Sequence, residues 1–250
     1  MLENWPSWLR RSVFTLTGVA WANKYAWQCQ NKTNSQHEML KTLFTDRKVK
    51  LNVVGEEQLS GLDACIIAGN HPHGLWDGIA LAVLASRSGH KTKVVARDFL
   101  NVFEPLRQTF LTVTLNNNRQ IKSRKSPIAP AQQVLANGGR VVITPAGGLS
   151  IASPFWSQAV DPQWRTGVVR MMQASGQPVV LVHIDAGHSP MRQLLHRIHP
   201  IVRSLAQLLM FRWQRTKPLT LTVVDVIQPE DLPYPDMQSN AIWLQQKLSG

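Results

Sequence analysis

The stretch AGNHPHGLWDG, from Ala68 to Gly78, decides the fold prediction for this chain. An apolar run over 64–68 precedes it and predicts a buried strand, and a second apolar run over 78–85 follows it and predicts a helix. In α/β proteins, functional side chains gather in the turns beyond the carboxyl ends of the strands. The sequence therefore predicts a functional site in the turn that carries His71 and Asp77.

The residue types in this turn indicate acid–base chemistry. Imidazole can take up and return a proton near neutral pH, and a carboxylate beside it fixes its tautomer and stabilises the imidazolium. The sequence has no G-x-S-x-G motif, and neither Cys29 nor Cys65 stands in a catalytic-looking setting. A base without an enzyme nucleophile indicates that the substrate brings the attacking group, for instance a hydroxyl.

Outward from this turn, strand and helix patterns alternate along residues 46–250. This alternation predicts one α/β domain with a mostly parallel or mixed sheet flanked by helices, and it shows no internal repeat or linker. The predicted strands are 49–54, 64–68, 93–96, 110–115, 140–144, 178–184 and 219–227. The predicted helices are 78–85, 99–107, 128–136, 164–175 and 237–248, with a long amphipathic basic segment over 191–214.

Residues 1–45 are predicted to form an N-terminal amphipathic helical segment. Apolar rings and arginines alternate near its start, which suits a helix at the headgroup boundary of a membrane. The alternative is an N-terminal helix that packs onto the domain. The residues concerned are Trp5, Trp8, Leu9, Arg10, Arg11, Val13, Phe14 and Leu16.

The composition favours a membrane-surface partner. The 250 residues include 27 Lys and Arg against 15 Asp and Glu, a formal charge of +12 that attracts nucleic acid, anionic lipid or an acidic carrier protein. Nine tryptophans, several beside arginines, favour a membrane interface, and we expect no nucleic acid. Two cysteines indicate a reducing, cytoplasmic setting. The apolar stretch from Ser12 to Trp21 is too short and too polar to span a bilayer, so we expect peripheral association, at the inner face of the cell membrane if the protein is bacterial.

A second constellation is the Gly-rich turn from Thr144 to Ser150, which follows a predicted strand. Such a turn can expose consecutive backbone N–H groups that bind a phosphate or an oxyanion. Gly-Gly turns are common, so this one indicates a binding site only together with the His/Asp turn.

Three stretches together carry a resemblance: NHPHGLWDG, RDFLNVFEPLRQTFLTV over 97–113 and RVVITPAGGLS over 140–150. They resemble the glycerophospholipid/lysophospholipid acyltransferase superfamily, most closely its hemolysin-like branch, from about Val49 to Ile227. Five residues separate His71 from Asp77, whereas the usual signature has four; that branch carries the longer spacing.

The resemblance implies an acyltransferase-type domain and an O-acyltransferase reaction. His71 would deprotonate the hydroxyl of a lysolipid, Asp77 would orient His71, and the acyl group would come from acyl-CoA or an acyl-carrier protein. No cofactor is implied, because a thioester is already activated. The substrate-binding residues implied are Asn70, His73, Gly74, Arg97, Arg119, Pro145, Ala146, Gly147 and Gly148, with Lys122, Arg124 and Lys125 behind the arginines.

Several alternatives stay open at this point. His73 would replace His71 as the base if the turn were a regular helix, which Pro72 and Gly74 argue against. The family's Gly-rich motif usually carries a carboxylate, and the turn from Thr144 to Ser150 has none. The alternatives are therefore a non-catalytic lipid- or nucleic-acid-binding protein or a thioester hydrolase. A metal site is not expected, because the spacing of the histidines matches no ligand set; these are His183, His188, His196 and His199.

Overall fold

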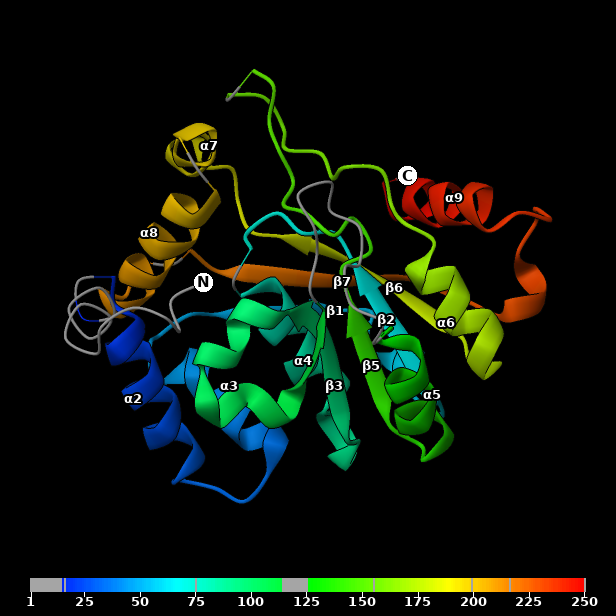
Figure 1. Ribbon diagram of the computed structural model, residues 1–250, viewed down its shortest axis with the longest axis horizontal. Helices are drawn as coiled ribbons and strands as arrows, with labels where there is room; N and C mark the ends of the chain where they lie inside the picture. Colours follow the sequence, from blue (N-terminus) through cyan, green and yellow to red (C-terminus); the bar gives the residue numbers. More distant parts are fainter. Residues whose placement is uncertain are drawn as a thin grey trace.

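The computed structural model describes residues 15, 17–74, 76–113, 126–154, 156–198, 200–215 and 217–249. These residues form one seven-stranded sheet in the order β1-β7-β6-β2-β5-β3-β4 (Figure 1). The strands are β1 Leu51–Val54, β2 Cys65–Gly69, β3 Thr92–Arg97, β4 Phe110–Val113, β5 Arg140–Ile143, β6 Val179–Asp185 and β7 Leu219–Ile227. The fold is therefore the α/β fold with a mixed sheet that the strand–helix alternation predicts.

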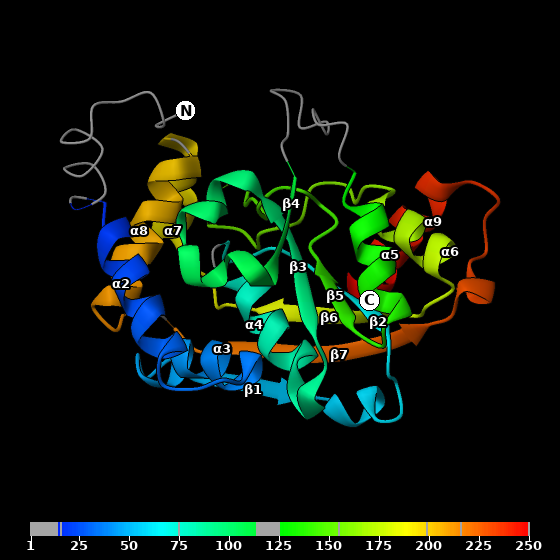
Figure 2. The ribbon, with the colours of Figure 1, turned by 60° about the horizontal axis from the view of Figure 1, so that its bottom comes forward.

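Helices cover both faces of the sheet, as Figures 1 and 2 show. One face carries α2 (Val19–Gln30), α3 (Gln36–Thr45), α4 (Asp77–Ala85) and α8 (Pro200–Arg212). The other face carries α5 (Ile128–Ala136), α6 (Gly167–Ser175) and α9 (Met237–Ser249). The remaining elements are α7 (Pro190–Ile198) and the short 3-10 helices η1 Glu56–Leu59, η2 Arg87–Gly89, η3 Asp98–Val102, η4 Glu104–Thr109 and η5 Pro229–Asp231.

The central strand β2 shows why the sequence folds into three layers. All five of its residues are buried, which is typical of a parallel strand covered by helices on both sides. Successive side chains of a strand point to opposite faces. Cys65 and Ile67 accordingly pack against the α2, α3 and α4 layer, whereas Ile66 and Ala68 pack against the α5, α6 and α9 layer.

The strand directions place the candidate site at one edge of the sheet. Strands β2, β3, β4, β5 and β6 are parallel to one another, so their carboxyl ends meet at the same edge. Strand β7 is antiparallel to β6, and β1 is parallel to β7. The His/Asp turn after β2 and the Gly-rich turn after β5 therefore come from neighbouring strands and lie at this edge.

Three of the predicted elements differ from the structure. Residues 99–107 form the two 3-10 helices η3 and η4 rather than one helix, with Pro105 in the first turn of η4. Helix α6 begins at Gly167, so Trp164 stands before the helix and is fully buried. The basic segment over 191–214 is divided into α7 and α8, and Pro200 begins α8, as proline favours the first turn of a helix.

Two parts of the sequence prediction lie outside the described residues. They are the start of the N-terminal segment, with Trp5, Trp8 and Leu9, and the basic loop with Arg119 and Lys122. Helices α2 and α3 are described, and both contribute buried side chains to the core; Tyr25 and Phe44 are two of them.

The first prediction concerns the packing of α4 onto the sheet. Leu81 is fully buried, so Leu81→Ala should lower the free energy of unfolding by roughly 2–5 kcal/mol, the cost of the lost burial and of the cavity left behind. Urea unfolding at neutral pH measures this change. The exposed Met237→Ala should stay within about 0.5 kcal/mol of wild type, and an equal loss in both variants would contradict the packing described.

Candidate active site

A histidine–aspartate pair is the centre of the turn that follows β2. The His71 Nδ1 atom lies 2.9 Å from Asp77 Oδ2. The same carboxylate oxygen accepts hydrogen bonds from the backbone N–H groups of His73, at 3.0 Å, and Gly74, at 2.7 Å. The Asp77 carboxylate therefore holds both the turn and the imidazole ring in place.

Asp77 is fully buried, and it is the first residue of α4. Burial alone would raise the pKa of its carboxyl group. The hydrogen bond and the charge of His71, together with the Gly74 N–H, outweigh burial and hold that pKa below its usual range. The helix N-terminus also favours a negative charge at this position. Asp77 is accordingly ionised near neutral pH and fixes the His71 ring with its proton on Nδ1.

Gly74 allows the turn to close around the carboxylate. Its φ of +115° lies in the region that favours glycine, and a Cβ atom there would come within 3.1 Å of Leu149 and of Gln207. A side chain at this position would therefore be strained and would crowd Leu149 and Gln207. Gly74 also lines the cavity described below.

His73 does not lie with His71. Its side chain is buried, and burial lowers the pKa of the ring to about 3. The ring is therefore neutral at physiological pH. Of the two histidines that the sequence leaves open as a base, His71 lines the large cavity described below and His73 does not.

Asn70 joins two strands rather than lining the cavity. Its side-chain Oδ1 accepts a hydrogen bond from the backbone N–H of Ile184 at 2.6 Å, and its Nδ2 donates to the Ile184 carbonyl at 3.0 Å. This pair of bonds ties the end of β2 to β6. Asn70 therefore positions the first residue of the turn.

The Gly-rich turn after β5 lies beside the His/Asp turn. Pro145, Gly147 and Gly148 line the same cavity as His71, whereas Ala146 is buried in the core. Two of the N–H groups expected to bind an oxyanion are already used: Gly147 donates to the Thr144 carbonyl, and Ser150 donates to the His71 carbonyl at 2.9 Å. The second of these bonds links the two turns directly.

The cavity in front of His71 has a volume of about 890 Å³. It reaches from the ends of β3 and β5 to α2 and α8. Its wall is mostly apolar and aromatic, with contributions from Trp21, Tyr25, Trp76, Phe99, Phe103, Phe110, Leu208 and Phe211. A hydrocarbon chain is the kind of ligand that such a wall fits.

Three arginines stand in the cavity wall. Arg97, which is expected from the sequence to bind substrate, is exposed at the end of β3, and its guanidinium lies 5.7 Å from the Phe99 ring. Arg165 and Arg170 were missed in the sequence analysis. Arg165 packs against the Gly-rich turn, because a Cβ atom on Gly147 would lie 3.2 Å from its Nε. Arg119 lies outside the described residues.

A polar network behind the site was also missed. Asp161 Oδ1 accepts from the His71 backbone N–H at 3.0 Å and from the Ser150 hydroxyl, while its Oδ2 accepts from Trp164 Nε1 at 3.1 Å. The fully buried Arg203 donates to the carbonyls of Ser150, Pro72 and His73. These residues are far from the turn in the sequence, so no local pattern could have identified them.

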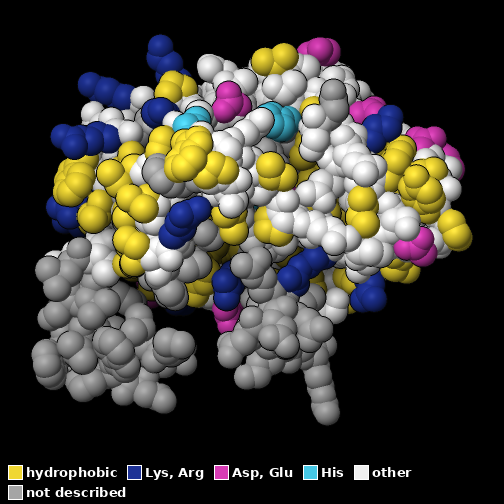
Figure 3. All heavy atoms as spheres, turned by 90° about the horizontal axis from the view of Figure 1, so that it is seen from above, with side chains coloured by type: hydrophobic (Ala, Val, Ile, Leu, Met, Phe, Trp, Pro, Cys, Tyr) yellow, Lys and Arg dark blue, Asp and Glu magenta, His cyan; other side chains and the backbone are white. Residues whose placement is uncertain are grey.

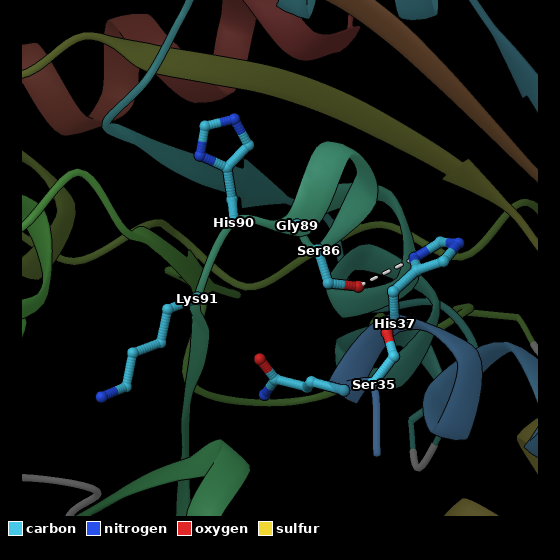
Figure 4. A pocket seen from close by; sticks show the side chains of 7 residues that line it. Ser35, His37, Ser86, Gly89, His90 and Lys91 are labelled. Carbon is cyan, nitrogen blue, oxygen red and sulfur yellow. Dashed lines mark hydrogen bonds between the residues drawn. The ribbon is translucent and has the colours of Figure 1, made fainter. Parts of the chain in front are cut away.

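The remaining histidines show no ligand cluster. Within the described ranges, no group of three His, Cys, Asp or Glu side chains is arranged to hold a metal ion. A second, smaller hollow of about 230 Å³ lies where α4 ends and β3 begins, and thus at the opposite edge of the sheet (Figure 4). His37 and His90 stand in it, and His37 Nδ1 lies 3.1 Å from the Ser86 hydroxyl. His90 therefore lies far from His71, at the opposite edge of the sheet.

A histidine held by a buried carboxylate lines a mostly apolar cavity at the carboxyl edge of the sheet, a geometry that can support acid–base chemistry on an amphiphilic ligand. A family model described as Acyltransferase matches residues 6–211. The chain belongs to this acyltransferase family, and the protein is an acyltransferase.

The comparison with solved structures supports the fold. The crystal structure of the 1-acyl-sn-glycerophosphate (LPA) acyltransferase PlsC from Thermotoga maritima aligns with a TM-score of 0.54 at 13% identity, over 95% of this chain and 90% of that one. At this identity the likeness concerns the fold. A search of curated proteins finds no match.

His73 predicts how stability depends on pH. Because its pKa falls from the ordinary 6.5 to about 3 on folding, the unfolded chain binds the proton first as the pH drops. Between about pH 5.5 and pH 4.5, where the unfolded chain has bound the proton and the folded chain has not, this group should lower the free energy of unfolding by about 1.4 kcal/mol per pH unit. The free energy of unfolding, measured with urea at several pH values across this range, should depend less steeply on pH in His73→Gln than in wild type. His90→Gln is the control, and equal slopes for wild type and His73→Gln would refute the assignment.

Asp161 gives a second prediction for the site. Asp161→Asn keeps the shape but turns one acceptor into a donor that faces the His71 N–H or the Trp164 indole. We expect kcat for acyl transfer to fall roughly 10- to 100-fold, with little change in KM, because small displacements of a reacting group are costly. Asp225→Asn, which removes a surface partner of Lys247, should leave kcat unchanged. Full kcat in folded Asp161→Asn would contradict this role.

Proposed function

We propose that the protein is an O-acyltransferase of phospholipid biosynthesis that moves a fatty acyl group from a thioester to a hydroxyl of a lysophospholipid or a related lipid. One observation carries the proposal: the His71–Asp77 pair stands in the wall of a large apolar cavity. The pair suits deprotonation of a hydroxyl, and the cavity suits an acyl chain. Membership of the acyltransferase family supports the reaction class.

The geometry suggests the proton path. With its proton on Nδ1 facing Asp77, His71 presents the lone pair of Nε2 as a general base. As Nε2 takes the proton from the acceptor hydroxyl, the hydroxyl oxygen attacks the thioester carbonyl and forms a tetrahedral intermediate. When this intermediate collapses, the carbon–sulfur bond breaks and the thiolate leaves. The imidazolium, stabilised by Asp77, returns the proton to the sulfur.

The arginines of the cavity wall are the proposed ligands for phosphate. Arg165 is the first candidate, because it packs against Gly147 in the same cavity as His71. Arg97 and Arg170 stand in the same wall, and guanidinium groups bind phosphate in a bidentate manner. The phosphate can belong to a lysophospholipid headgroup or to the donor.

The donor is proposed to be acyl-CoA or an acyl-carrier protein, since both present a thioester and both are anionic. The formal charge of +12 favours either donor and favours an anionic membrane surface. We propose a peripheral, cytoplasmic location, with the N-terminal segment at the membrane. Among the described residues, no helix has the length and apolar character needed to cross a bilayer.

Thiol release tests the proposal. Long-chain acyl-CoA or acyl-carrier protein is incubated with the protein, with and without a panel of lysolipids, and both the free thiol and the acylated lipid are measured. We expect release that depends on a lysolipid and that falls about 10²- to 10⁴-fold in His71→Ala, because a general base contributes a factor of this size.

The controls separate this function from its alternatives. His90→Ala removes a histidine at the opposite edge of the sheet and should retain full activity. Thiol release without any acylated lipid would identify a hydrolase. No release with either donor, from a folded protein that still binds vesicles, would leave a lipid-binding protein as the function.

A further inference from the structure

The hairpin formed by α7 and α8 has an unusual charge pattern. From Pro190 to Pro218 the sequence contains no Asp or Glu. It contains the basic residues Arg192, Arg197, Arg203, Arg212, Arg215 and Lys217. Arg203 is buried, whereas Arg197, Arg212, Arg215 and Lys217 are exposed, and exposed positive charges attract anionic surfaces.

Large apolar side chains stand exposed on the same hairpin. On α7, Met191, Leu194 and Ile198 follow one another at a helical spacing of three and four residues, and Ile198 is 67% exposed. Beyond them, Val202, Met210 and Trp213 are also exposed, Trp213 to 59%. Figure 3 shows hydrophobic and basic side chains side by side at this end of the molecule, on the left. We call this surface, formed by the exposed side chains of α7 and α8 and of Trp213, the hairpin face.

The opposite side of the hairpin contacts the active site. Arg203 is fully buried and donates to the carbonyls of Pro72 and His73, and Gln207 also donates to the His73 carbonyl. One and two turns further along α8, Leu208 and Phe211 line the acyl-chain cavity. The helix that forms part of the cavity wall therefore also carries the hairpin face.

We propose that the hairpin face docks onto an anionic lipid surface and places the cavity beside the bilayer. Exposed apolar rings and chains among arginines are typical of a helix at the headgroup boundary. An acidic protein partner would use the charges but leaves the exposed Met191, Leu194 and Ile198 unexplained. This inference rests on the proposed function, because it supplies the source of the lipid acceptor.

Vesicle co-sedimentation of the full chain tests the proposal. The probes are vesicles of phosphatidylcholine alone and of phosphatidylcholine mixed with phosphatidylglycerol. We expect stronger binding to the mixed vesicles, with a loss in high salt as the charges are screened. The double variant Leu194→Glu with Ile198→Glu should bind the mixed vesicles at least about tenfold more weakly, because it places carboxylates in the docking face.

The matched control changes two exposed apolar residues elsewhere. Met237→Glu with Val224→Glu adds the same charge on α9 and β7 and should bind within about twofold of wild type, since these residues lie outside the hairpin face. Trp213→Ser is a second, neutral test that also should weaken binding. Circular dichroism and urea unfolding check that each variant is folded.

The outcomes separate the inference from the proposed function. Vesicle binding at wild-type strength in folded Leu194→Glu/Ile198→Glu and in Trp213→Ser overturns the docking inference, even if acyl transfer is intact. Loss of acyl-carrier-protein binding with vesicle binding retained would assign the face to that protein instead and equally overturn it. The hairpin variant should transfer acyl groups to a monomeric, dissolved lysolipid at the wild-type rate. If the wild-type protein transfers no acyl group to any lysolipid, while the hairpin variant loses vesicle binding, the proposed function fails and the docking inference stands.

Discussion

The structure of the site depends on one buried carboxylate. Asp77 stands at the start of α4 with no access to water, where an ionised group is stable only if hydrogen bonds replace its hydration. One of its oxygens accepts from His71, His73 and Gly74 and so determines the shape of the whole turn. The conformation of Gly74 and the tautomer of His71 follow from this requirement. The electrostatic need of a single side chain therefore organises the groups proposed to act on the substrate.

A second layer of polar contacts connects this turn to distant parts of the chain. Asp161 and Arg203 bind the backbone of the His71 turn, Asp161 through an N–H group and Arg203 through carbonyl groups. Burial lowers the pKa of Arg203 to about 10, which still leaves it protonated near neutral pH. A buried cation among carbonyl groups is stable only while the surrounding structure stays in place, so loss of these contacts is costly. The turn is thereby fixed by the tertiary structure rather than by its own sequence alone.

The site and the surface meet in α8. Its inner side supports the turn and lines the cavity, and its outer side carries apolar residues that a soluble helix would normally bury. The proposed reaction brings together a polar thioester and a lipid that resides in a bilayer. A helix that belongs to both the cavity wall and the exposed face provides a short path between the two.

Local sequence patterns predicted the α/β architecture and the strand that ends at the His/Asp turn, and the structure confirms both; the same patterns singled out His71 and Asp77 as the candidate pair. These depend on local periodicity and on residue types close together in the chain, which is why they can be read directly. The sequence predicted a single helix over 99–107 wrongly, because the alternation of apolar residues does not separate an α-helix from two 3-10 turns. Only the tertiary structure assigned His73 to the interior, brought Arg165 onto Gly147, and joined Asp161 and Arg203 to the turn. These contacts depend on how strands and helices far apart in sequence pack, and no local pattern of residues encodes that packing.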